Sequence, residues 1–133
     1  SPNTLRSVAL ESAIDPLAWQ ALCSQADLVA NSGVVAWHQG AQIALFYLPD
    51  APAGEQLFAI ENRDPKSGAN VIGRGIIGHL KGDLVIASPL YKQHFRLKDG
   101  SCVEYPDLHL RTWPARISGE VVEISSRPAE AFA

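Results

Sequence analysis

Short segments of alternating or mostly apolar residues follow one another along most of the chain. Residues 56–61 alternate polar and apolar positions in the way expected of a half-buried strand. The segments that predict strands are residues 19–23, 33–37, 42–48, 56–61, 83–87, 94–98, 102–105, 110–117 and 121–124. No long stretch has the 3.6-residue period of an amphipathic helix. The pattern therefore predicts an all-β fold.

Turn-forming residues separate these segments about every ten to fifteen positions, which is typical of an antiparallel β-sandwich or barrel. Asp99-Gly100 is the strongest hairpin signal in the chain. The connection at residues 38–41, which contains a glycine able to take positive φ, and Ser118-Gly119 predict two more hairpins. Residues 24–28 predict a turn or a single helical turn.

One stretch, from residue 62 to residue 82, breaks this rhythm because it is rich in glycine and shows little alternation. A long excursion of this kind between strands is more often a functional loop than filler. It contains a G-x-G-x-x-G match at residues 73–78, but no βαβ unit surrounds the match. We therefore interpret the match as accidental, and we do not expect it to bind a dinucleotide.

The length of 133 residues favours one domain spanning residues 1–133, with an ordered core at about 17–125 and frayed ends at 1–15 and from Ser125 onward. Hydrophobic residues make up 47% of the chain and charged residues 19%, below the roughly 25% usual in soluble domains. This composition excludes intrinsic disorder and leaves apolar surface to spare. No apolar run is long enough for a membrane helix, and no signal peptide opens the chain.

The net charge of −3 hides an asymmetry between two parts of the sequence. Residues 62–98 carry seven basic and two acidic side chains, a net charge of +5, and the other residues carry four basic and 12 acidic ones, a net charge of −8. The basic stretch could attract an anionic partner or simply be a solvated face. Nucleic acid is not the expected partner, because the pI is acidic and no basic stripe is interleaved with aromatic residues.

The residues that could carry chemistry are few: two Cys and four His. Cys23 and Cys102 lie in apolar, strand-like contexts and are expected to be unpaired, buried thiols. The histidines, His38, His79, His94 and His109, have neither zincin spacing nor a Cys-x-x-Cys partner, so each is expected to be structural. No nucleophile elbow is present, and no independent catalytic site is predicted.

The segments flanking the glycine-rich excursion resemble the cluster-binding half of a Rieske [2Fe–2S] ferredoxin domain. They are Asn62-Arg-Asp64 and the stretch from Gly82 to Gly100, in which a Gly-Asp turn enters a strand and a second strand ends at a Gly turn. The resemblance implies an antiparallel β-sandwich or barrel with a cluster-loop-like subdomain at about residues 61–98. A Rieske centre takes two Cys and two His, delivered as Cys-x-His and Cys-x-x-His.

All four ligands are absent from the corresponding positions. Asn62 and Asp64 occupy the first pair, and Ser88 and Tyr91 occupy the second. Serine and asparagine cannot replace thiolates, and a phenol is a poor substitute for imidazole. We therefore expect no cluster, metal or other cofactor in this chain, with the loop architecture and Pro89 kept.

Longer strings resemble one subfamily, the small subunits of assimilatory NAD(P)H-dependent nitrite reductases. They occupy residues 43–50, 59–65, 67–71, 74–78 and 87–95, the last reading Ala-Ser-Pro-Leu-Tyr-Lys-Gln-His-Phe. The resemblance covers about residues 19–124 and implies a cytoplasmic accessory subunit in the reduction of nitrite to ammonium. The large subunit, its implied partner, would carry FAD, sirohaem and an iron–sulfur cluster.

By analogy with cluster-bearing relatives, the expected contact surface for the large subunit is the former cluster region. Its candidate residues are Arg63, Lys66, Arg74, Pro89, Leu90, Tyr91 and Lys92. Two alternatives remain open. One is an electron-transfer ferredoxin that holds iron through unusual ligands, such as Asp64, His79, His94 and Cys102. The other is a module that binds an anion through the basic loop.

Overall fold

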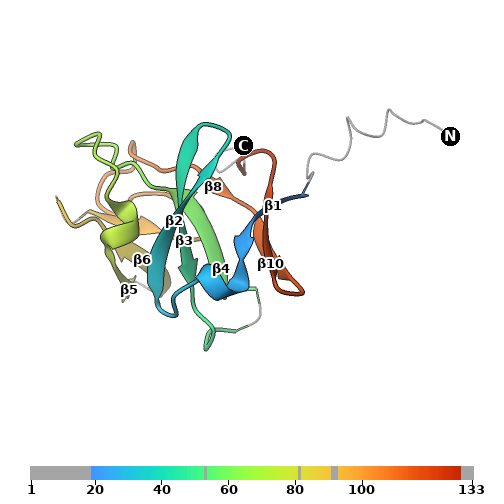
Figure 1. Ribbon diagram of the computed structural model, residues 1–133. Helices are drawn as coiled ribbons and strands as arrows, with labels where there is room; N and C mark the ends of the chain where they lie inside the picture. The colour runs from blue at the N-terminus through green and yellow to red at the C-terminus, as the bar shows by residue number, and fades with distance from the viewer. Residues whose placement is uncertain (1–18, 53, 81, 91–92, 130–133) are drawn as a thin grey trace, which may run out of the picture.

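The structure is a computed structural model that describes residues 19–52, 54–80, 82–90 and 93–129. Its strands form three antiparallel sheets (Figure 1), which confirms the all-β prediction. The strands are β1 (Trp19–Ser24), β2 (Ser32–His38), β3 (Ala41–Tyr47), β4 (Leu57–Glu61), β5 (Ile76–Leu80), β6 (Asp83–Ala87), β7 (His94–Arg96), β8 (Thr112–Trp113), β9 (Ala115–Ser118) and β10 (Val121–Ser125). In the described residues the helices are two 3₁₀ turns, η1 (Gln25–Asp27) and η2 (Ile72–Arg74).

The three sheets lie side by side, with the largest in the middle. This four-stranded sheet has the order β2-β3-β4-β8. Sheet β5-β6-β7 lies on one side of it and sheet β1-β10-β9 on the other, as Figure 1 shows from left to right. The domain therefore has two cores, one on each face of the central sheet.

Strand β3 explains how one sheet serves two cores. Successive side chains of a strand point to opposite faces. Ile43 and Leu45 pack into the core shared with β10, whereas Ala44 and Phe46 pack into the core shared with β6 and β7, and all four are fully buried. A strand covered on both faces needs apolar residues at every position, which accounts for the unbroken run Ile-Ala-Leu-Phe.

The glycine-rich excursion is not a loop throughout, and this corrects the sequence interpretation. Ile76–Leu80 forms strand β5, which pairs with β6 from Ile76 opposite Ala87 to Leu80 opposite Asp83. In its sheet, β5 pairs with β6 on one side only. The hydrogen bonds of β5 come from its backbone pairing with β6, and Ile76 and His79 are exposed. The strand therefore needs no regular alternation of apolar and polar residues.

The segment expected as one strand at residues 110–117 is two strands in different sheets. Pro114 separates β8, which pairs with β4, from β9, which pairs with β10. Proline has no N–H to donate to a sheet, so the chain changes sheet there. Its carbonyl oxygen still accepts the N–H of Ser125 at 2.9 Å.

At Asp99-Gly100 the structure has a turn after β7, but no second strand follows to complete the expected hairpin. Residues 102–105 form no strand, and Cys102 makes only an isolated bridge with Phe95. Gly100 has a φ of +79°, and a Cβ there would collide with the carbonyl oxygen of Leu110. The glycine therefore lets the returning chain pack directly against the turn.

The single helical turn expected near residues 24–28 is confirmed as η1. Ser24 caps it by accepting the N–H of Ala26, and Asp27 accepts the N–H of Ser24 in return. The expected fraying at residues 1–15 lies outside the described residues. The fraying expected from Ser125 onward is wrong at its start, because Ser125 is fully buried at the end of β10 and the N–H of Ala129 donates to the carbonyl oxygen of Thr112 at 2.7 Å. None of the helices in the described part of the chain is long and apolar enough to cross a membrane.

Candidate functional site

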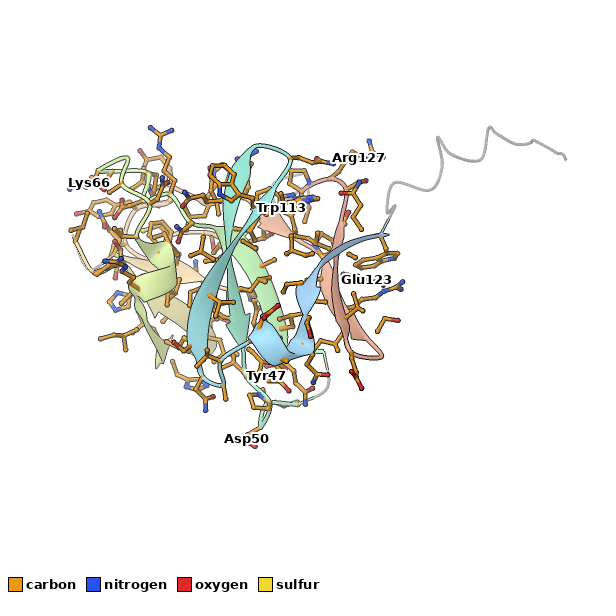
Figure 2. The ribbon with its side chains drawn as sticks, in the orientation of Figure 1. Tyr47, Asp50, Lys66, Trp113, Glu123 and Arg127 are labelled. Carbon is orange, nitrogen blue, oxygen red and sulfur yellow. The ribbon has the colours of Figure 1, made fainter. Side chains whose placement is uncertain are left out.

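The sequence-predicted site lies where two loops meet at one end of the domain. The first loop, residues 62–74, follows β4 and includes η2, and the second follows β6. We call the described residues 62–74, 88–90 and 93 the tip. In Figure 2, Lys66 of the tip lies at the end of the molecule opposite Glu123 of β10. The tip is therefore far from the sheet that carries the chain ends of the described region.

Asp64 joins the two loops from a fully buried position. Its Oδ2 accepts the hydroxyl hydrogen of Ser88 at 2.5 Å. Its Oδ1 accepts the backbone N–H of Lys66 at 2.8 Å and that of Ser67 at 3.3 Å. One carboxyl group thus closes the turn of its own loop and binds the neighbouring loop, two tasks that a metal cluster performs in a Rieske centre.

Asn62 occupies the other first-loop position and is 2% exposed. Its Oδ1 accepts the N–H of Gly73 at 2.7 Å, and its Nδ2 donates to Oε1 of Gln42 at 2.9 Å. Its backbone N–H also donates to the Gln42 carbonyl oxygen at 3.0 Å. The amide side chain therefore ties the end of β4 to β3 on one side and to η2 on the other.

Ser88 and Gln93 close the second loop, and both are buried. The N–H of Ser88 donates to the carbonyl oxygen of Gln93 at 2.9 Å. Among the described residues, Oε1 of Gln93 has no hydrogen-bond partner. Tyr91, the fourth predicted position, lies outside the described residues.

The chemistry of these side chains does not fit a Rieske cluster. A [2Fe–2S] centre needs thiolates on one iron and imidazoles on the other. The three described positions offer an amide, a carboxyl and a hydroxyl instead, and each is already hydrogen-bonded within the protein. The arrangement can hold two loops together, and it offers no thiolate or imidazole to iron.

The two cysteines lie in the two different cores, and neither is part of the tip. Cys102 is buried beside Phe95, and Cys23 packs against the core shared with β10; both are free. Burial raises the pKa of both thiols, and the nearby Asp27 raises the pKa of Cys23 further. A thiol with a raised pKa is a poor nucleophile and a poor metal ligand at neutral pH.

The histidines also have local partners or face outward. His94 Nδ1 lies 2.6 Å from Oε2 of Glu104, and His38 Nε2 lies 3.0 Å from the carbonyl oxygen of Ser125. Burial alone would raise the pKa of Glu104, but hydrogen bonds from the backbone and ring of His94 lower it overall. His79 faces outward on β5.

The alternative iron-ligand set, Asp64, His79, His94 and Cys102, is not assembled by the fold. His94 and Cys102 both contact Glu104, with the Cys102 Sγ 3.7 Å from its Oε1, whereas Asp64 is engaged in the tip. In the part of the chain that the structure describes, no group of three His, Cys, Asp or Glu side chains is placed to hold a metal ion.

The predicted contact residues lie at the surface of the tip where the structure describes them. Arg63, Lys66, Arg74, Pro89 and Leu90 are exposed, while Tyr91 and Lys92 lie outside the described residues.

The sequence interpretation missed several exposed apolar side chains, and the most exposed of them are Ile76, at 76%, and Trp37, at 66%. Trp37 lies in an apolar strand and gives no sign in the sequence that it faces outward. Ile76 comes directly after the tip, so its position in the glycine-rich excursion was the available signal.

Comparison with known proteins identifies the family. A family described as Rieske-like [2Fe-2S] domain matches residues 18–125. The nitrite reductase (NADH) small subunit of Salmonella typhimurium strain LT2 is 41% identical over 108 residues, which cover 80% of this chain and 95% of the relative. A Klebsiella oxytoca protein named nitrite reductase [NAD(P)H] large subunit is 34% identical over 117 residues, covering 88% of this chain and 12% of the relative.

Solved structures agree with this assignment. The nitrite reductase [NAD(P)H] small subunit of Erwinia carotovora superposes with a TM-score of 0.67 at 37% identity, covering 84% of each chain. The ferredoxin of carbazole 1,9a-dioxygenase from Nocardioides aromaticivorans has a TM-score of 0.67 at 15% identity, covering 82% of this chain and 98% of the ferredoxin, and so shares the fold. The chain therefore belongs to the Rieske-like domain family and, within it, to the small subunits of NADH nitrite reductase.

Proposed function

We propose that this chain is an accessory subunit that binds the large subunit of a cytoplasmic NAD(P)H-dependent nitrite reductase through the tip and carries no cofactor of its own. In this role it supports the reduction of nitrite to ammonium, while the large subunit carries the redox groups. The proposal gives the chain a binding task and no chemical step.

The observation that carries the proposal is the hydrogen-bonded tip. Asp64 binds Ser88 across the two loops, and Asn62 binds Gln42 and Gly73. Buried polar groups are tolerated when they are hydrogen-bonded, so the loops can keep a defined shape without a metal. A tip of fixed shape is what a docking surface requires.

The relative from Klebsiella oxytoca supports the large subunit as the partner. A segment similar to nearly the whole of this chain belongs there to a protein named as the large subunit. Two domains on one polypeptide stay at high effective concentration. A small subunit on a separate chain needs a binding surface to stay associated with the large subunit.

The composition of the tip supports its use as that surface. Leu90 is 49% exposed, Ile76 beside the tip is 76% exposed, and the tip also exposes Arg63 and Arg74. Apolar anchors and arginines are favoured in protein interfaces, and cations around them raise the rate of encounter with an acidic partner.

The test compares two matched double variants in binding to the purified large subunit. Arg74→Gln with Leu90→Ala removes one charge and one apolar side chain from the tip. Arg116→Gln with Val121→Ala does the same on β9 and β10, at the other end of the domain. We expect the tip variant to raise the dissociation constant at least about tenfold. The control should change it by less than about twofold. Equal binding by both variants would contradict docking through the tip.

Two further readouts test the remaining parts of the proposal. Protein purified without exposure to oxygen should be colourless and contain no stoichiometric iron. Nitrite-dependent oxidation of NADH by the large subunit should change when this chain is added, and the tip variant should reduce that change. Stoichiometric iron in this chain would contradict the assignment of all redox groups to the large subunit.

A further inference from the structure

A small pocket lies beside the tip, at the end of the hairpin formed by β2 and β3. It encloses about 200 Å³. Small-molecule sites are commonly roughly 300–1,000 Å³, so this pocket is of a size for one side chain. Its lining includes Trp37, Gln42, Glu61, Arg63, Asn70 and Arg111. We call it the Trp37 pocket.

The lining has an excess of positive charge. Arg111 Nη2 lies 3.2 Å from Oε2 of Glu61, so these two charges pair. Arg63 makes no ion pair with a described residue. Its guanidinium lies beside Gly68, with Nη2 3.3 Å from the position that a Cβ on this glycine would occupy. One further carboxylate would balance the charge of the pocket.

Trp37 forms the apolar wall, and its exposure is unusual for so large a side chain. It is 66% exposed on β2, the last strand on its side of the central sheet. Val35, two residues earlier and on the same face of the strand, is 50% exposed and lies against Gly73 of the tip. The apolar surface therefore continues from the tip to the pocket.

Hydrogen bonds and a ring contact hold part of the pocket lining. Asn62 fixes the amide of Gln42, which lines the pocket, at 2.9 Å. Arg111 lies 5.1 Å above the ring of Trp113, and its backbone N–H donates to Glu61 at 3.1 Å. Lining residues that are already held in place lose little conformational entropy on binding, which favours affinity.

We propose that the Trp37 pocket receives a carboxylate side chain from an acidic segment of the nitrite reductase large subunit and is the anchor of the docking surface. This inference rests on the proposed function. Trp and Arg are the residue types that most often dominate interface energies, and a planar guanidinium matches a carboxylate. The pocket adds Trp37 and Arg111 to the surface that sequence interpretation placed at the tip alone.

The experiment measures the dissociation constant between the full chain and the purified large subunit for Trp37→Ala and Arg63→Gln. We expect the dissociation constant to rise at least about thirtyfold for Trp37→Ala and about tenfold for Arg63→Gln. The effect of Arg63→Gln should become smaller at high salt. Arg116→Gln and Val121→Ala are the matched controls, expected to stay within about twofold. Thermal unfolding of each variant checks that the fold is kept.

The outcomes separate the two proposals. If the unaltered chain does not bind the large subunit, the proposed function fails. If it binds, and Arg74→Gln with Leu90→Ala weakens binding while Trp37→Ala and Arg63→Gln do not, only the pocket inference is overturned. It is also overturned if Trp37→Ala abolishes self-association of the chain without affecting the large subunit. A saturable shift of the Trp37 indole N–H by millimolar nitrite, with unchanged binding of the large subunit in both pocket variants, would assign the pocket to a small anion instead.

Discussion

The central sheet and the tip both contain fully buried side chains, yet these side chains are held by different means. Strand β3 has apolar side chains on both faces, and Ile43, Ala44, Leu45 and Phe46 are fully buried. The tip instead buries polar side chains, and those of Asn62, Asp64 and Ser88 each have a specific partner, as in the bond from Ser88 to Asp64. Apolar contacts tolerate many partners of similar volume, whereas a buried hydrogen bond does not.

The chain shares its fold with a ferredoxin, and the difference shows which parts of that fold are held by the chain's own side chains. The cores on either side of β3 depend on apolar burial and need no cluster. The tip needs some link between its loops, because loops have little apolar surface of their own to hold them. Here the bond from Ser88 to Asp64 supplies this link, whereas Asn62 ties the first loop to β3 and Ile72 packs with Phe46 in the neighbouring core.

The largest expected effect comes from the apolar region. Phe46→Ala removes a fully buried ring that packs in the core between the central sheet and β5-β6-β7. We expect the free energy of unfolding to fall by about 3–5 kcal/mol, measured by urea denaturation. Val121→Ala, at an exposed position, should change it by less than about 0.5 kcal/mol. Similar losses in both variants would contradict the assignment of this core.

A smaller effect is expected from the polar region. Asp64→Ala leaves the Ser88 hydroxyl and two backbone N–H groups without their acceptor, and we expect a loss of about 2–3 kcal/mol in the free energy of unfolding.

A double-mutant cycle sharpens this test, because it isolates the contact between the loops. Asp64→Ala and Ser88→Ala should be non-additive by about 1–2 kcal/mol in the free energy of unfolding. Additive losses would mean that the two loops are not linked through this bond, and the comparison between the two regions would then fail.

The smallest effect concerns a partly exposed contact next to the tip. Hydrogen bonds from His94 lower the pKa of Glu104 below its ordinary value of 4.5. The contact between His94 and Glu104 therefore stabilises the folded state fully above about pH 4.5. This stabilisation is lost as the pH falls through the lowered pKa that Glu104 has in the folded state.

Because both side chains are about one-third exposed, the effect should stay below about 1 kcal/mol. Urea unfolding from pH 7 to pH 3 measures it. Glu104→Gln should flatten the pH dependence in the acid range. An identical pH profile for this variant would show that the contact does not contribute. Asp83, whose pKa is lowered chiefly by its hydrogen bond from Arg96, acts in the same direction.

The sequence was most informative where apolar periodicity determines structure. The segments at β2, β3, β4, β6 and β10 were predicted close to their observed bounds, because these strands bury at least one face. Strand β5 was missed because it depends on pairing with β6 and has two outward-facing residues. The break at Pro114 was missed because apolar residues continue on both sides of it.

The sequence proposes which residues stand at the Rieske ligand positions, but it could not predict their interactions. Asn62, Asp64 and Ser88 were placed by resemblance to a Rieske domain, which says which residues stand there. That Asp64 reaches Ser88, or that Asn62 holds Gln42, depends on how segments 24 and 20 residues apart in sequence meet in space. The exposure of Trp37 depends on the same three-dimensional arrangement.

Hydrogen exchange of the tip amides in iron-free protein tests the central claim most directly. The informative amides are the N–H groups of Gly73, bonded to Asn62, of Asp64, bonded to Ala69, and of Ser88, bonded to Gln93. Exchange protection reports the free energy of local opening. With iron removed by a chelator and its absence verified, we predict that these amides stay protected well above unstructured-peptide rates and that Asp64→Ala lowers their protection. Amides that exchange freely until iron is supplied would contradict a tip held by hydrogen bonds in place of a metal.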